Sequence, residues 1–368
     1  MKTVNPEVRA GPNAIPPPLL AVEGLAVHFP VTTGFLWRRS IGAVRAVDGV
    51  TFDLHYGQTL GLVGESGSGK STTGRALVRL NIPSAGSVRL EGREILGEGN
   101  DATADLRRRV QMIFQDPYSS LNPRMTVGAI IGEPLGIHRL GSTAERRARV
   151  LELLDIVGLP RRAADRCPHQ FSGGQRQRIG IARALALRPD LVIADEPISA
   201  LDVSIQAQIL NLMKRLQKDL GLAYLFISHD LAAVRYISNR IMVMYLGRIV
   251  EVADSVDLYT RPLHPYTVAL LSAAPVPNPR IERNRERIIL TGEVPSPSEA
   301  PRGCRFRSRC WLCRRLGDPE ECRTMEPELT SMRPGRSVAC HFSDLIDGSP
   351  EQTAAPANPG RQDLSRRS

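Results

Sequence analysis

The chain has 368 residues, of which 42% are hydrophobic, and its formal net charge is +10. A chain of this length can bury a substantial core in more than one domain. No apolar run approaches the ~20 residues that span a bilayer, and the N-terminus lacks the hydrophobic core of a secretion signal. We therefore expect a cytoplasmic protein, in which clustered cysteines hold a metal more often than a disulfide.

The positive charge alone does not indicate a nucleic-acid partner. Nearly all the basic residues are arginines, and they are not arranged in blocks interleaved with aromatic side chains, which make up only 5% of the chain. We expect a solvated arginine-rich surface and no bound nucleic acid. Such a surface also suits the neighbourhood of an anionic membrane face.

In chain order, residues 1–18 are rich in proline and lack periodicity, which predicts a disordered tail. Short runs with β-branched residues and glycine-bearing turns follow and predict strands. These predicted strands are residues 19–29, 46–54 and 59–65. We expect the stretch 30–42 between the first two to be an irregular loop insertion.

The pattern becomes helical between about residues 124 and 190, and buried-strand patterns return at 191–195 and 223–229. Strands that alternate with helices predict an α/β fold with a mostly parallel sheet covered on both faces. The chain turns rich in proline and arginine after Tyr266, and residues 346–368 form a second low-complexity tail.

A phosphate-binding loop is predicted where the third strand runs into GESGSGKST, which matches G-x-x-x-x-G-K-[ST]. Its glycines let successive backbone N–H groups converge on phosphate oxygens at a helix N-terminus. Lys70 would reach the β- and γ-phosphates of a nucleotide, and the Ser71 hydroxyl would bind Mg²⁺. A chance glycine-rich turn is the alternative, and the scarcity of lysine elsewhere weighs against it. The predicted nucleotide-binding residues are Gly64, Glu65, Ser66, Gly67, Ser68, Gly69, Lys70, Ser71 and Thr72.

A second motif, LVIADEP at residues 191–197, ends a buried strand with two carboxylates. Phosphoryl transfer to water needs one group that holds the metal and another that orients the attacking water. We predict that Asp195 binds Mg²⁺ and that Glu196 is the base. The alternative, a strand that ends in two solvated acids, is common for an isolated Asp-Glu pair.

Between these motifs, FSGGQRQRIGIARAL at residues 171–185 offers a second anion cradle at a helix N-terminus. This stretch resembles the signature motif of the ABC transporter ATPases, with Phe171 in place of the usual leucine. Other motifs of that family follow the same order. Gln115 in IFQDP resembles the Q-loop, Asp202 in SALD the D-loop, and His229 in FISHD the switch histidine.

The resemblance covers roughly residues 19–272 and implies an ABC nucleotide-binding domain, with a RecA-like P-loop core, a mixed sheet and a helical subdomain at about 124–190. It also implies a head-to-tail dimer that sandwiches each ATP. The partner's ATP would meet the signature residues Ser172, Gly173, Gly174 and Gln175. Glu196 would act as general base, His229 would hold the γ-phosphate, and Gln115 would contact Mg²⁺ or water.

An aromatic residue just after the first strand stacks on adenine in this family, and Phe29 occupies that position. Phe35 and Trp37 in the predicted insertion are rivals for this role. An aromatic side chain at a strand end can also serve simple packing.

The residues after Met244 resemble those of the ATPases of oligopeptide and dipeptide importers. The C-terminal extension, residues 273–345, resembles the extension of the same ATPases. The insertion before residue 43 resembles that of the second of the two ATPases in such importers. This implies a heterodimer with a related ATPase, two transmembrane permease subunits and an extracytoplasmic substrate-binding protein, at the cytoplasmic face of the inner membrane. A nickel importer of the same family and a soluble ABC ATPase acting on nucleic-acid complexes are the alternatives.

Five of the six cysteines lie in the extension. Cys304, Cys310, Cys322 and Cys340 match a pattern that holds a [4Fe–4S] cluster in some relatives, while Cys313 looks like an extra residue. Zinc is the less favoured metal, because Cys₄ zinc sites typically pair two C-x-x-C hooks, and only Cys310 and Cys313 form one here. Reduced thiols without a metal are the third possibility.

Overall fold

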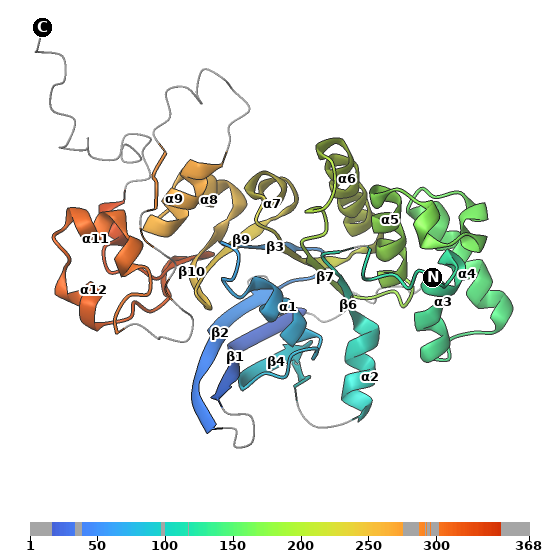
Figure 1. Cartoon of the computed structure of the whole chain (residues 1–368), viewed down its shortest axis with the longest axis horizontal. Helices are drawn as coiled ribbons and strands as arrows, with labels where there is room; N and C mark the ends of the chain where they lie inside the picture. Colours follow the sequence, from blue (N-terminus) through green and yellow to red (C-terminus); the bar gives the residue numbers. More distant parts are fainter. Residues whose placement is uncertain are drawn as a thin grey trace, which may run out of the picture.

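The computed structural model describes residues 17–33, 39–96, 100–116, 118–274, 287–290, 292, 295 and 302–346. A long central sheet runs through the molecule, with helices on both faces and a smaller antiparallel sheet beneath it (Figure 1). This confirms the α/β fold class.

Eight strands form the central sheet. In spatial order they are β11 (Thr330–Arg333), β12 (Arg336–Val338), β10 (Arg248–Asp254), β9 (Arg240–Tyr245), β3 (Thr59–Val63), β8 (Ala223–Ile227), β7 (Leu191–Asp195) and β6 (Val110–Ile113). The strands from β9 to β6 are parallel, whereas β10, β12 and β11 pair antiparallel. The carboxyl ends of β3, β6, β7 and β8 therefore meet at one edge, where ligands bind in open α/β sheets.

The smaller sheet is antiparallel, and its strands are β2 (Arg39–Leu54), β1 (Leu20–Thr33), β4 (Ala85–Leu90) and β5 (Arg93–Glu94). The prediction of an irregular loop over residues 30–42 was wrong for most of that stretch. Pro30 pairs with Ala43 and Val31 with Gly42, so β1 and β2 continue as a long hairpin. Only 34–38 of this stretch lie outside the described residues. Pairing with a neighbouring strand, which local composition does not reveal, stabilises this extended segment.

Three helices and two short 3₁₀ turns form the helical subdomain, at one end of the molecule in Figure 1. They are α3 (Val127–Ile137), α4 (Thr143–Ile156), η1 (Arg161–Asp165), η2 (Pro168–Gln170) and α5 (Gly173–Ala184). Local sequence sets where they begin: Ser142 caps α4 in a capping box with Glu145, and the Thr126 side chain accepts a hydrogen bond from Ala129 N at the start of α3.

The remaining helices cover the two sheets and build the extension. Those of the core are α1 (Lys70–Leu77), α2 (Asn100–Arg109), α6 (Val203–Leu220), α7 (Leu231–Ile237), α8 (Ser255–Thr260) and α9 (Pro265–Ala273). Those of the extension are η3 (Arg307–Arg309), α11 (Trp311–Arg315), α12 (Glu320–Thr324) and η4 (Ser343–Leu345). Gly221, in the left-handed conformation at φ 69°, ends α6.

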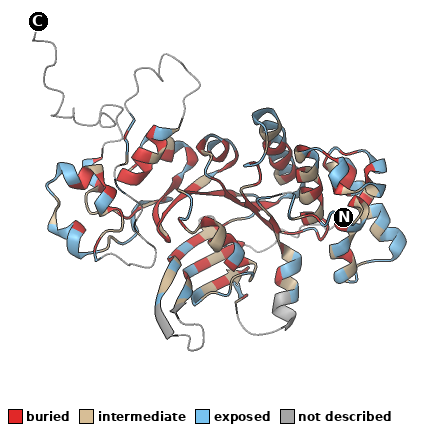
Figure 2. Cartoon of the chain, in the orientation of Figure 1, coloured by how far each residue is buried: buried red, intermediate tan, exposed pale blue. Residues whose placement is uncertain are grey.

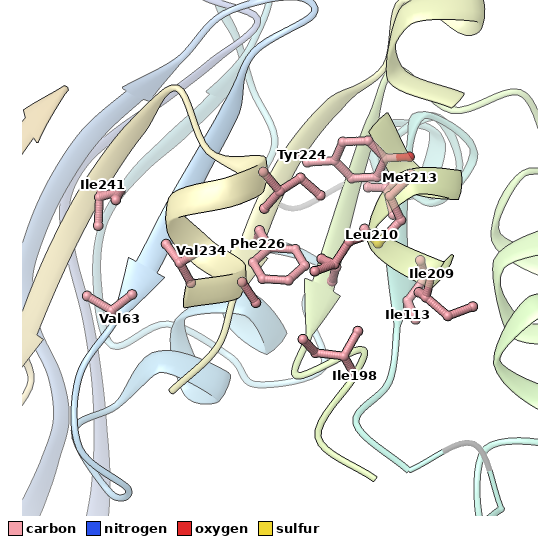
Figure 3. Close-up of a cluster of buried hydrophobic side chains, with 14 of the residues drawn as sticks. Val63, Ile113, Ile198, Ile209, Leu210, Met213, Tyr224, Phe226, Val234 and Ile241 are labelled. Carbon is pink, nitrogen blue, oxygen red and sulfur yellow. The ribbon is translucent and has the colours of Figure 1, made fainter. Parts of the chain in front are cut away.

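Two apolar cores lie on opposite faces of the central sheet, because side chains alternate along each strand. On β8, Tyr224 and Phe226 face the core beneath α6 and α7, whereas Leu225 and Ile227 face the core shared with α1 and the smaller sheet. Figure 3 shows Phe226 among side chains that include Val234 of α7 and Leu210 of α6. The buried strands stand out at the centre of Figure 2, while the outer surfaces of the helical subdomain and the extension are exposed.

The C-terminal extension is part of the central sheet. Its strand β12 pairs with β10, with Val338 opposite Glu251. The fully buried Glu251 carboxylate accepts hydrogen bonds from Leu263 N at 2.8 Å and His264 N at 2.9 Å, and its Oε1 lies 3.3 Å from the Arg336 guanidinium. This buried carboxylate therefore joins β10, the chain before α9, and the extension.

Candidate ATP-binding and hydrolysis site

The predicted phosphate loop follows the buried strand β3 and ends where α1 begins at Lys70. Gly69 has φ 105°, and a Cβ there would lie 2.0 Å from the Ala46 carbonyl oxygen. Gly64 is equally confined, since its Cβ would lie 2.2 Å from the Met244 carbonyl oxygen. These two glycines let the loop pass closely between β2 and β9.

Lys70 lies at the centre of this loop. Its Nζ donates hydrogen bonds to the carbonyl oxygens of Gly64 and Glu65, both at 2.8 Å. Burial lowers the pKa of Lys70, and the nearby carboxylates of Glu196, Asp195 and Glu65 act in the opposite direction. The ammonium group therefore lies on the concave side of the loop, where its hydrogen-bond partners at 2.8 Å are backbone carbonyl oxygens.

Ser71 and Asp195 meet beside the loop, with Ser71 Oγ donating to Asp195 Oδ1 at 2.7 Å. The Asp195 side chain is fully buried, and burial raises its pKa. Its Oδ2 has no hydrogen-bond partner among the described residues, and the closest cation, Arg75, is 3.8 Å away. A buried carboxylate oxygen left unpaired beside a hydroxyl suits Mg²⁺, which takes oxygen ligands. These two predicted metal ligands therefore fit the ion.

Glu196 follows directly and leaves the strand in a left-handed conformation, with φ 47°. A glutamate at positive φ is strained, and its N–H bond to Ile227 O at 2.9 Å helps to hold it there. Gln115 Nε2 donates to Glu196 Oε2 at 2.8 Å, and His229 Nδ1 lies 3.1 Å from Oε1. The three predicted catalytic residues thus meet where β6, β7 and β8 end.

The signature residues lie elsewhere, at the start of α5 in the helical subdomain (Figure 1). Ser172 and Gln175 form a reciprocal capping box, and both are exposed. Gly174 is required locally, because a Cβ there would lie 2.4 Å from Ile205 Cγ2. Asp202, the D-loop residue, is exposed at the start of α6. These residues present a second polar surface to the solvent.

Phe29, the predicted adenine platform, is 43% exposed on β1. It pairs with Val44, two residues before Ala46, whose carbonyl oxygen abuts the phosphate loop. An exposed aromatic ring on the strand pair beside the loop can stack on a base. The rivals Phe35 and Trp37 lie outside the described residues.

Sequence reasoning missed one part of the site, the contact between the extension and the phosphate loop. Arg309 binds the Glu65 carboxylate with both terminal nitrogens, at 2.7 and 3.0 Å, and Glu65 N donates to the Tyr266 hydroxyl at 2.8 Å. The motif GCRFRSRC contains three alternating arginines that bind different carboxylates. No spacing rule identifies their partners.

The five cysteines of the extension line one small cavity beneath α11. Burial raises the pKa of each thiol, to about 12 for Cys313 and Cys340 and about 11 for Cys322, which favours the neutral form. Within the described part of the chain, no three His, Cys, Asp or Glu side chains are arranged to hold a metal ion. Cys313 donates to Asp318 at 3.3 Å. The arrangement thus brings together the predicted cysteines without forming a metal site.

None of the helices in the described ranges is both long and apolar enough to cross a membrane.

Comparison with known proteins agrees with this geometry. The ABC transporter family model matches residues 47–199, and the model of the oligopeptide/dipeptide transporter C-terminal region matches residues 250–315. The oligopeptide transport ATP-binding protein AppF of Bacillus subtilis is 51% identical over 325 residues, covering 88% of this chain and 97% of AppF. YkfD of the same organism is 55% identical over 329 residues, covering 88% of this chain and 95% of YkfD.

A solved structure of the ATP-binding cassette MJ0796, a dimer in a post-hydrolysis state bound to ADP and Pi, shares the fold with a TM-score of 0.56. It is 29% identical and covers 64% of this chain and 98% of that cassette. The nickel-importer and nucleic-acid alternatives are not favoured by these relatives. The chain belongs to the ABC transporter family, as the ATP-hydrolysing subunit of an oligopeptide/dipeptide-type transporter.

Proposed function

We propose that this ATPase drives import of oligopeptides or dipeptides, with Glu196 as the base that activates the attacking water. The observation that carries the assignment is the position of its carboxylate. Gln115 and His229 hold it from both sides, at 2.8 and 3.1 Å, beside the Ser71–Asp195 pair. Water held by Glu196 would face a γ-phosphate seated in the loop.

Lys70 binds the β- and γ-phosphates in this proposal. Its Nζ exchanges the carbonyl oxygens of Gly64 and Glu65 for phosphate oxygens, and the loop amides supply further donors. Ser71 and Asp195 would hold Mg²⁺, which neutralises charge that develops on the phosphates. Phe29 would stack on adenine.

His229 has a second role. Its imidazole lies between Glu196 and the solvent, with a side chain that is 60% exposed. Nδ1 faces the Glu196 carboxylate, which can only accept a hydrogen bond, and Nε2 would donate to the γ-phosphate in the imidazolium form. His229 thus orients the base and contacts the phosphate that the activated water attacks. Gln115 joins Glu196 to the segment that begins the helical subdomain.

The signature residues Ser172 to Gln175 are proposed to bind the ATP of a partner subunit. Ser172 and Gln175 are exposed, and all four residues belong to the helical subdomain, away from α1, so the phosphate loop of one chain supplies half of each site. We propose that the partner is a related ATPase and that Asp202 lies at their contact. ATP binding then closes two half-sites and moves the subunits as rigid bodies.

The assembly is proposed to contain two permease subunits and an extracytoplasmic binding protein, with this subunit at the cytoplasmic face of the inner membrane. The support is membership of an oligopeptide/dipeptide-type transporter family and the names of relatives such as AppF. Cargo selection would then belong to the other subunits.

The test is Glu196→Gln in the assembled transporter. We expect turnover to fall by about 10²–10⁴-fold, because the base is lost, while ATP stays bound and traps a closed state. Lys70→Ala is the matched comparison and should weaken ATP binding itself. Normal hydrolysis by Glu196→Gln would contradict the proposal, and so would unchanged ATP binding by Lys70→Ala.

An iron–sulfur cluster in the extension is a separate proposal. Its support is the convergence of Cys304, Cys310, Cys322 and Cys340 on one cavity, where the thiols would have to move closer together to bind a metal ion. Thiolates are the ligands such a cluster takes, so binding would displace four protons. Anaerobically purified protein should contain iron and sulfide and absorb near ~400 nm. Colourless protein that lacks both iron and zinc would refute every metal assignment for these thiols.

A further inference from the structure

The C-terminal extension reaches the phosphate loop through the side chain of Arg309. Arg309 Nη1 donates to Glu65 Oε2 at 2.7 Å and Nη2 donates to Oε1 at 3.0 Å. The Arg309 side chain is 7% exposed, whereas that of Glu65 is 29% exposed. This is the paired geometry in which a guanidinium and a carboxylate bind most strongly. Glu65 immediately follows Gly64, and its own carbonyl oxygen binds Lys70.

A rigid apolar support holds Arg309 in place. Its guanidinium lies 5.9 Å from the centre of the Tyr245 ring, and that ring packs against Tyr266 and Phe306 at 4.8 and 5.2 Å. Trp311, two residues later, donates from Nε1 to Pro265 O at 3.0 Å. Arg309 is therefore positioned by β9, α9 and the extension together, before any ligand binds.

The negative charge of Glu65 opposes the binding of ATP, which is itself an anion, to the phosphate loop. Its carboxylate lies close enough to Lys70 to act on the charge of that ammonium. ATP adds several negative charges to the same loop, and like charges in a partly buried site repel strongly. Arg309 supplies the opposite charge directly on the carboxylate. Within the loop Gly64–Thr72 itself, the remaining charged residue is then Lys70.

We infer that Arg309 is a positioning residue for ATP binding: it neutralises Glu65, fixes the start of the phosphate loop, and makes the C-terminal extension part of the nucleotide site. The inference rests on the proposed binding of ATP to Gly64–Thr72. A structural clamp and a charge partner make different predictions. If Arg309 only clamps the loop, removal of either partner weakens ATP binding. If its charge matters, removal of Arg309 and removal of the Glu65 charge have opposite effects.

The experiment measures the affinity of the full-length chain for a non-hydrolysable ATP analogue with Mg²⁺ by calorimetry, well below the melting temperature of each variant. Arg309→Gln should raise Kd about tenfold, because it leaves the Glu65 carboxylate unpaired beside the phosphates. Glu65→Gln should lower Kd, since the Arg309 charge is then free to attract them. The double variant should recover most of the affinity that Arg309→Gln loses.

Arg307→Gln is the matched control. Arg307 lies on the same turn, but it binds Asp318 within the extension, at 2.7 Å through both nitrogens. Its loss should lower the melting temperature slightly and leave Kd unchanged. Arg309→Lys should fall between wild type and Arg309→Gln, because it keeps the charge without the paired geometry.

Two results would overturn the inference: an unchanged Kd for Arg309→Gln, or a double variant as weak as Arg309→Gln alone. If Arg309→Gln does not fold, Glu65→Gln decides by itself, since tighter binding supports the charge role and weaker or equal binding refutes it. Lys70→Ala separates this inference from the function proposed above. Loss of binding in Lys70→Ala with no effect of Arg309→Gln would refute the inference alone, whereas unaffected binding in Lys70→Ala would refute the site.

Discussion

Two glycines of the phosphate loop differ in what surrounds them, although both have positive φ. Gly67 has φ 79° and open space where a Cβ would lie, whereas the space at Gly69 is filled by the Ala46 carbonyl. A left-handed conformation costs a side chain about 1–2 kcal/mol, but a contact with backbone at 2.0 Å cannot be relieved without moving β2. Gly67 is thus favoured for its positive φ alone, whereas Gly69 is also required because there is no room for a Cβ atom.

We therefore predict that Gly69→Ala destabilises the fold much more than Gly67→Ala. The Gly67 variant should lose only the conformational cost, about 1–2 kcal/mol in the free energy of unfolding. The Gly69 variant should lose considerably more, or fail to fold. Chemical denaturation of both chains with wild type measures the difference. Equal losses at the two positions would show that the close approach to Ala46 does not constrain the loop.

At the level of elements, the extension is joined to the nucleotide-binding core at several places. Strand β12 continues the central sheet, Arg309 binds the phosphate loop, and Arg305 binds Asp48 of β2. The Asp48 carboxylate is 12% exposed, and it also lies 3.5 Å from Arg248 and 3.1 Å from the His28 ring. This cluster connects the smaller sheet, the central sheet and the extension.

The Asp48 cluster predicts a stability that depends on pH. Burial raises the pKa of Asp48, but the hydrogen bond and charge of Arg305, together with Arg248 and His28, outweigh burial and lower it. A carboxyl group whose pKa is lowered by folding stabilises the fold above its unfolded pKa of about 3.9, and that stabilisation is lost as the pH falls through the folded value. At neutral pH the stabilisation is present in full.

We predict that Asp48→Asn lowers the free energy of unfolding by about 1–3 kcal/mol at pH 7 and that the difference from wild type disappears well below pH ~4. Melting temperatures of both chains across this range test it. Asp155→Asn is the control, since Asp155 is exposed and pairs only with Arg161 among the described residues. A difference between wild type and Asp48→Asn that stays constant down to pH ~3 would exclude the ionised carboxylate as its cause.

At the scale of the whole molecule, the proposed function assigns parts of an ATP site to two separate surfaces of the chain. The phosphate loop and Glu196 lie at the carboxyl edge of the central sheet, whereas Ser172 and Gln175 lie in the helical subdomain. Both side chains are exposed, and each accepts a hydrogen bond from the backbone N–H of the other residue in a capping box. A second chain placed head to tail would bring its signature surface to this loop.

We predict that the purified chain alone hydrolyses ATP slowly and that its specific activity rises with protein concentration or on addition of the related ATPase. The reason is that half of each site must come from another chain. Steady-state phosphate release over a dilution series measures this. Ser172→Arg should remove the increase and leave ATP binding by the same chain intact. Rapid hydrolysis that does not depend on concentration would argue against the shared site.

The chemistry of this protein can be predicted from short segments of its sequence. The phosphate loop, the Asp195–Glu196 pair and the signature motif are contiguous segments, so their residue types and spacing alone indicate nucleotide binding. The alternation of buried strands with helices likewise predicted the fold class, because side-chain periodicity follows local backbone geometry. The extension was likewise predicted from a contiguous stretch of sequence, which resembles that of the importer ATPases.

Which distant residues act together depends on the three-dimensional fold. Gln115, Glu196 and His229 meet because parallel strands bring their carboxyl ends to one edge, and Arg309 reaches Glu65 across 244 residues of chain. The hairpin of β1 and β2 was missed because pairing, not composition, keeps residues 30–33 extended. Such contacts depend on strand order and on the orientation of single side chains. No local pattern records these, and they alone make the extension a neighbour of the ATP site.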